Sequence, residues 1–376
     1  MPPVAAQGLV TGSNRIDRES AFPKANQERY SGHDQHAVTE PLDIEQHDAL
    51  LAYLRSAGHI AAGESPTLTT LLGGVSSRAV KVERPAGPRW VIKQSLARLR
   101  VEVEWYSNPE RIHREALGIR WLSDLAPPGS VPALVFEDHA QHLLAMNAVP
   151  QPHCNWKTAL LAGALDVDHV RQFGHLLGTI HRRASERQSE IASVFDDRSV
   201  FESLRIEPYY GYTACQVPDA APFMAHLIEC VRGRRITLVH GDYSPKNILV
   251  HAGRLVLLDH EVIHFGDPAF DLGFSIAHLL SKAHHLKDKR DAFTSAAEIY
   301  WRAYRESIGE VEWAGDLEGH AIRNTLGCLL ARVAGRSPLE YLSCDQRTRQ
   351  REVALRLMRE IPPSIADLAW RFSRTL

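Results

Sequence analysis

The chain has 376 residues, which is enough for roughly two or three domains or for one enzyme fold built from two lobes. Hydrophobic residues make up 44% and charged residues 23%, values typical of a globular protein. The 43 Lys and Arg against 45 Asp and Glu give a formal net charge of −2, which favours neither a nucleic-acid-binding protein nor one that binds anionic membranes. We therefore expect a small-molecule partner, with no nucleic acid and no membrane.

The five Cys residues are odd in number and form no Cys-x-x-Cys pair, which favours reduced thiols and a cytoplasmic protein. No basic start followed by an apolar stretch and no run of about 18 apolar residues is present, so we expect neither a secretory signal nor a membrane span. The pairs His33/His36 and His284/His285 are expected in loops or on the surface rather than at a metal, because no matching Cys or His pair completes either site.

The first half of the chain predicts a tail and a small lobe. Residues 1–42 mix Pro, Gly, Ser, Asn and charged residues without an apolar period, which predicts a flexible tail. The apolar spacing over residues 42–58 predicts a short helix, and that over 109–125 predicts a second. Residues 43–148 are therefore predicted to form an N-terminal lobe with a small antiparallel sheet, its strands at 67–72, 79–83, 90–94, 133–137 and 142–147.

Residues 149–376 are predicted to form a mostly helical C-terminal lobe, which makes the whole fold α+β. One β-prone island interrupts the helical pattern, with runs at 237–239, 248–250 and 255–258 and a hairpin turn at 251–254. Because a hairpin brings its two ends together, Asn247 and Asp259, which flank it, are expected to be neighbours. The predicted helices lie at 167–185, 190–204, 219–232, 268–283, 288–307, 316–334 and 345–360.

A cluster of polar residues surrounds this hairpin: His240-Gly241-Asp242-Tyr243-Ser244-Pro245-Lys246-Asn247 precedes it and Asp259-His260-Glu261 follows it. The side-chain oxygens of Asn247 and Asp259 form an oxygen-only pair, which suits Mg²⁺. Asp242 would then be free to orient a hydroxyl group and accept its proton. Phosphoryl transfer needs this division of labour. The alternative is that these side chains only cap turns and a helix.

With Gly266-Asp267-Pro268-Ala269-Phe270-Asp271-Leu272-Gly273, this pattern resembles the aminoglycoside phosphotransferase and choline kinase family, whose bilobal fold is like that of protein kinases. The resemblance covers about residues 65–360. It implies a kinase that uses ATP and Mg²⁺ to phosphorylate a hydroxyl group of a small molecule. It also implies a role for each of five residues: Asp242 as catalytic base, Asn247 and Asp259 as Mg²⁺ ligands, His240 as a support inside the loop, and Asp271 as an acceptor of backbone hydrogen bonds.

The N-terminal lobe offers candidates for binding the nucleotide. The segment Leu72-Gly73-Gly74-Val75-Ser76-Ser77-Arg78 lies between two predicted strands, so its backbone N–H groups can cover phosphates, with Gly73, Gly74 and Ser76 as candidate contacts. The sequence contains neither a G-x-x-x-x-G-K-[ST] P-loop nor a G-x-G-x-x-G fingerprint. These absences disfavour the two commonest other nucleotide-binding folds.

The family resemblance adds four further nucleotide-side residues. Lys93 in Val91-Ile92-Lys93 is implied to contact the α- and β-phosphates, and Glu115 in the following helix is implied to hold it. A solvent-exposed helix position is the alternative for Glu115. Met146 and Asn147, at the end of the fifth predicted strand, fall where a hinge would hold adenine through backbone groups.

Three more residues are substrate-side candidates. Protein kinases commonly have a Lys two residues after the catalytic Asp, where this chain has Ser244. Lys246, four residues after Asp242, is placed either at the γ-phosphate or in solvent. For Glu261 there are three alternatives: it contacts the water shell of the metal, it contacts the substrate, or it lies on the surface. Arg332 is placed at the substrate or on a helix surface.

A partial resemblance links the chain to methylthioribose kinase, through residues 91–94, 99–101 and 111–117. That enzyme's catalytic loop ends in Ser where this chain has Asn247, and it carries an Arg pair where this chain has only Arg332. The alternative to an active kinase is a nucleotide-binding pseudokinase with a regulatory or scaffold role. A peptide kinase is disfavoured because few residues separate Asp259 from Gly266, which leaves little room for a peptide-docking segment. The identity of the acceptor, the choice between ATP and GTP and the oligomeric state stay open.

Overall fold

A computed structural model describes residues 42–101 and 104–376 of the protein. Residues 1–41 of the predicted tail lie outside the described residues. The helix predicted over 42–58 is α1 (His47–Ser56). It is followed by a five-stranded sheet that is antiparallel, as predicted, and has the strand order β1-β2-β3-β5-β4. The strands and the second helix of this lobe are β1 (Thr67–Thr70), β2 (Ser77–Glu83), β3 (Trp90–Ser95), α2 (Arg111–Leu125), β4 (Leu134–Asp138) and β5 (Leu143–Asn147).

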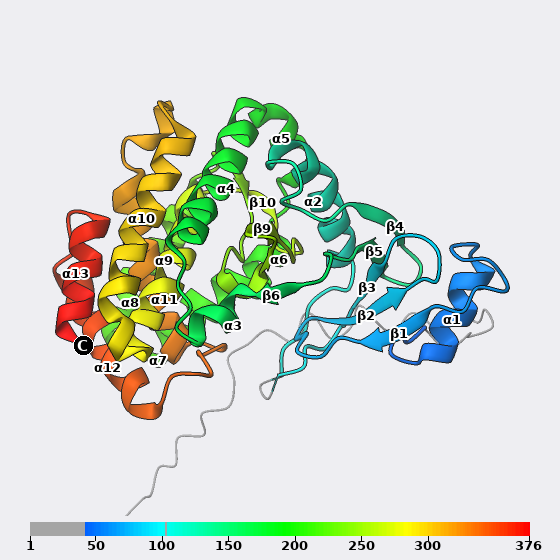
Figure 1. Ribbon diagram of the computed structural model, residues 1–376. Helices are drawn as coiled ribbons and strands as arrows, with labels where there is room; N and C mark the ends of the chain where they lie inside the picture. The colour runs from blue at the N-terminus through cyan, green and yellow to red at the C-terminus, as the bar shows by residue number, and fades with distance from the viewer. Residues whose placement is uncertain (1–41, 102–103) are drawn as a thin grey trace, which may run out of the picture. The chain divides into compact units, whose positions relative to one another are not determined.

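The two helices of the N-terminal lobe cover opposite faces of this sheet (Figure 1). Successive side chains of a strand point to opposite faces. On β5, Leu143 and Ala145 accordingly join the apolar cluster of α1, whereas Leu144 and Met146 join that of α2. The alternation fixes the face on which each side chain of the neighbouring strand β3 lies.

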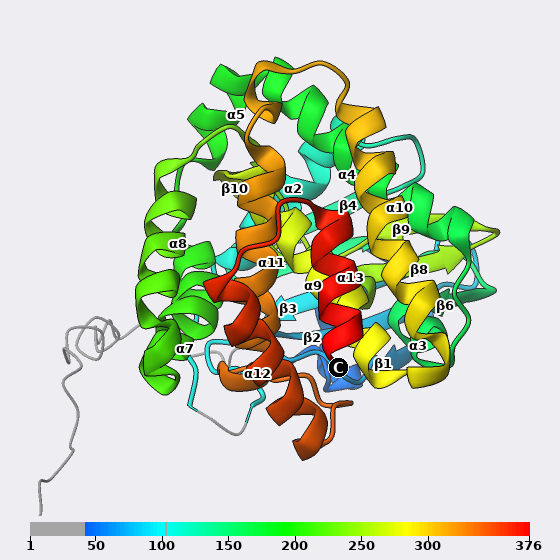
Figure 2. The same cartoon turned by 90° about the vertical axis from the view of Figure 1, so that its left-hand side faces the viewer.

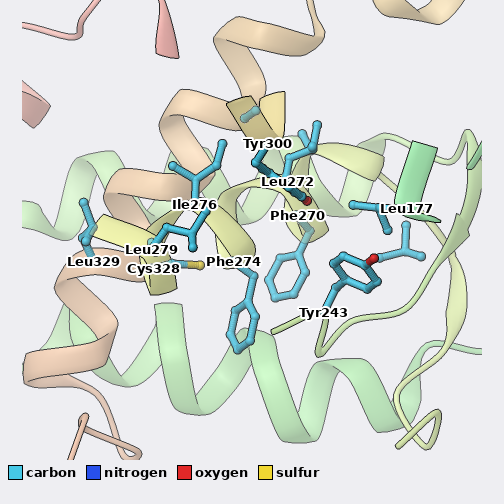
Figure 3. Close-up of a cluster of buried hydrophobic side chains, with 14 of the residues drawn as sticks. Leu177, Tyr243, Phe270, Leu272, Phe274, Ile276, Leu279, Tyr300, Cys328 and Leu329 are labelled. Carbon is cyan, nitrogen blue, oxygen red and sulfur yellow. The ribbon is translucent and has the colours of Figure 1, made fainter. Parts of the chain in front are cut away.

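The C-terminal lobe is built around α9 (Pro268–His285), which is buried along nearly all of its length. Apolar residues occur on all of its faces, as is typical of a helix enclosed by others. Figure 2 shows α10, α11 and α13 around it, and Figure 3 shows the aromatic and aliphatic side chains that fill the centre of this lobe. The other helices are α3 (Trp156–Leu161), α4 (Val167–Glu186), α5 (Gln188–Phe195), α6 (Ser199–Phe201), α7 (Tyr212–Gln216), α8 (Ala221–Gly233), α10 (Arg290–Ile308), α11 (Leu317–Ala334), α12 (Cys344–Arg359) and α13 (Ile365–Thr375).

The β-prone island forms two small sheets. β8 (Ile248–His251) and β9 (Arg254–Leu257) make the predicted hairpin, and β6 (His153–Asn155) pairs with its other edge. β7 (Thr237–Val239) pairs with β10 (His264–Gly266). The hairpin turn has positive φ at Ala252 (48°) and Gly253 (73°), which matches the twist of the two strands. The strands at both ends of the island, β7 and β9, are therefore each hydrogen-bonded to a neighbouring strand.

Two features of the C-terminal lobe differ from expectation. The region predicted as a helix over 190–204 runs instead through α5 and α6 into a π-helical segment, η2 (Glu202–Gly211). His284, expected in a loop or on the surface, is buried near the end of α9, where its ring hydrogen-bonds to Gln350 and burial lowers its pKa to about 4. Because α9 is packed on all sides, its polar residues are buried together with its apolar ones. His33 and His36 lie outside the described residues.

None of the helices within residues 42–101 and 104–376 has the length and apolarity needed to cross a bilayer. All five Cys residues are free thiols.

Candidate active site

The ammonium group of Lys93 lies between two carboxylates. Lys93 shares with Val91 the face of β3 that α2 covers, and Glu115 projects from α2. The Lys93 Nζ atom donates to both carboxylate oxygens of Glu115, each at 2.7 Å, and to Asp259 Oδ1 at 2.6 Å. Glu115 is fully buried, so its placement on an exposed helix face is wrong. These contacts join the sheet of the N-terminal lobe to the segment that follows the hairpin.

The charges in this group depend on one another. Burial alone would lower the pKa of Lys93, but the negative charges of Asp259, Glu115 and Glu261 raise it above its ordinary value. Burial raises the pKa of Glu115 to about 7, although Lys93 opposes the rise. Burial would also raise the pKa of Asp259, but the positive charges of Lys93 and Lys246 hold it below its ordinary value. Lys93 is therefore a cation and Asp259 an anion at neutral pH.

Asp271 fixes the loop that begins at His240. Its two carboxylate oxygens accept hydrogen bonds from the backbone N–H groups of His240 at 2.7 Å and Gly241 at 2.8 Å. Gly241 has φ of +76°, and a Cβ atom at this position would lie 2.8 Å from the side chain of Val262. Only glycine fits such a position without strain. His240 Nδ1 accepts from the backbone N–H of Asp242 at 3.2 Å, and burial lowers the pKa of this histidine, so its ring is neutral.

Asp242 and Asn247 face each other across the loop. Asn247 Nδ2 donates to Asp242 Oδ2 at 2.7 Å and to the Asp242 carbonyl at 2.9 Å. The amide nitrogen of Asn247 is used in these bonds, whereas its side-chain oxygen accepts no hydrogen bond in the described part of the chain. The backbone carbonyl of Asn247 accepts from Leu258 N at 2.9 Å, next to Asp259. The hairpin therefore brings the backbones of residues 247 and 259 close together, as expected.

Asp259 has an unusual backbone conformation. Its φ is +68°, and non-glycine residues rarely adopt such values. Residues held in this region often lie at functional sites, where the surrounding contacts stabilise the strained conformation. Here the contact is the ion pair with Lys93. The donors available beside it are carboxylate and amide oxygens, and this hard-oxygen chemistry fits Mg²⁺.

Two arginines at this site were not among the candidate residues. Arg205, on η2, lies 2.9 Å from Asp242 Oδ1 and donates from Nε to the Gly241 carbonyl at 2.8 Å. Arg111, at the start of α2, donates from Nε to Glu261 Oε2 at 2.9 Å. Arg205 belongs to no motif identified in the sequence, and Arg111 appears there only at the start of the 111–117 segment shared with methylthioribose kinase, with no role assigned. The partners of both arginines are far along the chain.

Arg111 also connects the glycine-rich segment to the site. It is almost fully buried, and its guanidinium donates to the backbone carbonyls of Ser76 and Leu96. Glu261 is thus held by a buried arginine. The segment with Gly73 and Gly74 lies between β1 and β2, as predicted.

The remaining candidates are not in direct contact with this group. Lys246 is exposed, and its carbonyl accepts from Asn155 Nδ2 at 2.7 Å. Met146 is buried near the end of β5. Arg332, on α11, is partly buried and donates to the hydroxyl of Tyr209 at 3.0 Å. The structure thus assembles Lys93, Glu115 and Asp259 in one group and Asp242, Asn247, His240 and Asp271 in an adjoining one.

A protein-family model described as "Phosphotransferase enzyme family" matches residues 67–315, which is more than half of the chain. The chain belongs to this family. Methylthioribose kinase 1 from Oryza sativa subsp. japonica is 24% identical over 271 residues, which cover 64% of this chain and 62% of that relative. The match thus spans less than two thirds of the relative's length. The match to the family model confirms the family prediction, and this relative supports the partial resemblance to methylthioribose kinases.

Two solved structures of the same fold extend the comparison. A macrolide 2'-phosphotransferase from Brachybacterium faecium has a TM-score of 0.50 at 22% identity, with coverage of 82% of this chain and 98% of that chain. A choline kinase from Cryptosporidium parvum Iowa II has a TM-score of 0.54 at 12% identity, with coverage of 84% and 96% respectively. The predicted fold, a protein-kinase-like arrangement of a small antiparallel-sheet lobe and a mostly helical lobe, is confirmed.

Proposed function

We propose that the protein is a kinase that transfers the γ-phosphoryl group of ATP to a hydroxyl group of a small molecule. The observation that carries this proposal is the position of Lys93, which bonds to Glu115 on one side and to Asp259 on the other. A lysine so placed presents a fixed positive charge beside a carboxylate suited to a divalent cation. Phosphoryl transfer depends mainly on such positioning and electrostatic stabilisation.

On the nucleotide side, Lys93 contacts the α- and β-phosphates and Glu115 holds it in place. The backbone N–H groups of Gly73, Gly74 and Ser76 cover the phosphates, and the backbone at Met146 binds adenine. Asn247 and Asp259 hold Mg²⁺ through their side-chain oxygens. When bound, Mg²⁺ supplies positive charge to the β- and γ-phosphate oxygens.

On the acceptor side, Asp242 orients the hydroxyl group and accepts its proton. The hydroxyl oxygen forms a bond to the γ-phosphorus, while the bond from that phosphorus to the oxygen bridging it to the β-phosphate breaks. The products are ADP and a phosphate monoester. Arg205 and Asn247 each bond to one carboxylate oxygen of Asp242, and these contacts support a fixed orientation for the base.

A coupled ADP-release assay against a library of hydroxyl-bearing metabolites tests this proposal. We expect release that depends on one or a few acceptors, stops when EDTA removes Mg²⁺ and returns when Mg²⁺ is added. Asp242→Asn is expected to lower turnover by roughly 10²–10⁴-fold, the contribution typical of a general base. Binding of AMP-PNP, measured by calorimetry, should be nearly unchanged in this variant.

Wild-type turnover in Asp242→Asn would remove the assigned base. Mg²⁺-dependent nucleotide binding without turnover on any acceptor would instead support a pseudokinase with a regulatory role.

A further inference from the structure

A buried lysine in the C-terminal lobe has no role in the mechanism above. Lys282 lies on α9 with no exposed surface. Its ammonium donates at 3.3 Å to the carbonyl of His278, one turn earlier on the same helix, and lies 5.5 Å from the ring centre of Tyr341. Within the described residues no carboxylate lies at ion-pair distance from it. Such a buried, unpaired cation is costly for a folded protein, which suggests that Lys282 has a functional role.

The groups that act on Lys282 are mainly positive. Its pKa is lowered to about 7, first by burial and then by the charges of Lys157 and Arg332. The carboxylate of Glu340 opposes this effect, and it forms an ion pair with Lys157. The Glu340 side chain is 63% exposed, so it can leave this pair at little cost. Three basic side chains therefore face one exposed carboxylate.

Two contacts place these basic residues beside the loop that carries Asp242. The guanidinium of Arg332 lies 5.6 Å from the ring centre of Tyr209, and that of Arg205, which pairs with Asp242, lies 5.6 Å from the same ring. Lys157 is in the first turn of α3. The residue that caps this helix, Asn155, donates to the carbonyl of Lys246 on the loop. The Tyr209 ring and the Arg205 guanidinium thus lie between the cluster and the proposed base.

Hydrogen-bonding groups in the cluster lack partners. The Nε atom of Arg332 and the hydroxyl of Tyr341 are both buried, and neither has a hydrogen-bond partner in the described part of the chain. Arg332 uses one guanidinium nitrogen for Tyr209 and for Ser337. Buried donors of this kind are normally satisfied. An oxygen-rich anion would supply acceptors for them.

We propose that Lys157, Lys282 and Arg332 bind an acidic group of the phosphate acceptor, a carboxylate or a phosphate, so that the substrate class is a hydroxyl-bearing anion. This inference rests on the proposed kinase function. The acidic group supplies the negative charge that the cluster lacks, while a hydroxyl group elsewhere on the same molecule reaches Asp242. A cationic acceptor, by contrast, would be repelled by three basic side chains.

Four probes that share one hydroxylated six-carbon chain test the charge preference. Gluconate carries a carboxylate and glucitol 6-phosphate a phosphate, whereas glucitol is neutral and glucamine is a cation. Binding is measured by calorimetry with Mg²⁺ and AMP-PNP present, so that the nucleotide site is filled. We expect at least one of the two anions to bind about tenfold more tightly than glucitol, and glucamine to bind more weakly than glucitol. The better of the two anions identifies the acidic group.

Variants test the residues. Lys282→Met is expected to weaken binding of the preferred anion by about tenfold, equivalent to about 1.4 kcal/mol, and to leave AMP-PNP binding unchanged. Lys287→Met, which removes an exposed lysine just beyond the end of α9, is the matched control and should bind the probes like the wild type. Arg332→Lys, which keeps the charge but not the planar fork, should show an intermediate loss.

Equal binding of all four probes, tighter binding of glucitol or glucamine, or an unchanged affinity in Lys282→Met overturns the inference. The kinase proposal can survive that result: Asp242-dependent ADP release with neutral or cationic acceptors would refute the acidic substrate and keep the kinase. Conversely, tight anion binding with no ADP release from any acceptor would refute the kinase and with it the substrate role of the cluster.

Discussion

Lys93 and Asp259, which are 166 positions apart in the chain, lie 2.6 Å apart at Nζ and Oδ1. One residue belongs to a central strand of the N-terminal sheet and the other follows the hairpin of the C-terminal lobe. The same ammonium also bonds to the buried carboxylate of Glu115. The two lobes are therefore connected through a charge that the proposed reaction requires, and stability and activity depend on one group of side chains.

Replacement of Lys93 by Met is expected to affect both. Removing one partner of a buried ion pair costs about 3–5 kcal/mol because the other charge remains buried. We expect a lower free energy of unfolding in urea and a loss of ADP release of about 100-fold or more, since the phosphates lose a fixed positive charge.

The double variant Lys93→Met/Glu115→Gln separates the two effects. It removes the buried carboxylate together with its cation, so it should recover much of the stability of the single variant and none of its turnover. Recovery of turnover would show that Lys93 acts only as a structural partner of Glu115.

Arg205 is expected to act by positioning Asp242. Its guanidinium bonds to one carboxylate oxygen of Asp242 and to the carbonyl of Gly241. Arg205→Met should lower kcat by roughly tenfold to 100-fold and leave the KM for ATP nearly unchanged, because the change affects the orientation of the base and not the nucleotide side. Arg205→Lys keeps the charge without the planar fork and should recover only part of the rate. An increase in the KM for ATP with kcat intact would contradict this role.

Two glycines with similar backbone angles allow a matched test of the loop. Gly241 and Gly253 have φ of +76° and +73°, but an added Cβ atom meets Val262 only at Gly241 and meets nothing within 4 Å at Gly253. Gly253→Ala should therefore cost only the backbone strain, about 1–2 kcal/mol. Gly241→Ala should cost more and also lower turnover, since the loop must shift to relieve the contact. Equal melting temperatures for the two variants would show that the contact with Val262 is unimportant.

Local pattern was sufficient to predict much of this site. The loop from His240 to Asn247, the hairpin and Asp259 lie within one short stretch, and strand alternation with turn residues identified the hairpin. The five strands of the N-terminal sheet were predicted from their β-prone runs and the turns between them, but their order, with β5 between β3 and β4, was not. Runs and turns depend on neighbouring residues, so a single sequence reveals them.

The parts that were missed depend on contacts between distant segments. Strand β6 pairs with β8 and is only three residues long, so it has no period of its own. The π-helical segment η2 contains Pro208, which would ordinarily end a helix. Arg205, on η2, becomes relevant only when folding brings it to Asp242. The sequence likewise identifies Lys282 only as a residue of a predicted helix, and its burial depends on the helices that pack around α9.

The burial of Lys282 predicts an unusual dependence of stability on pH. In the folded protein its pKa is lowered from 10.5 to about 7. Between these values the unfolded chain binds a proton that the folded chain does not, so the free energy of unfolding rises with pH. The destabilisation by the buried cation is therefore complete below pH 7 and disappears as the pH rises toward 10.5. Other groups that face Lys282 are His278, Lys157, Arg332, Glu340 and Tyr341.

Lys282→Met removes this titration. We expect the variant to be more stable than the wild type by several kcal/mol near about pH 6, with a gain that shrinks steadily toward about pH 9, as measured by urea unfolding at matched ionic strength. Lys287→Met should follow the wild type at every pH because its side chain is exposed. A constant difference between Lys282→Met and wild type across this range would mean that Lys282 is protonated throughout, and a loss of stability would mean that its ammonium contributes to folding. The expected gain in stability would show that the chain retains a cation that destabilises its fold. Residues retained for binding often destabilise a protein in this way.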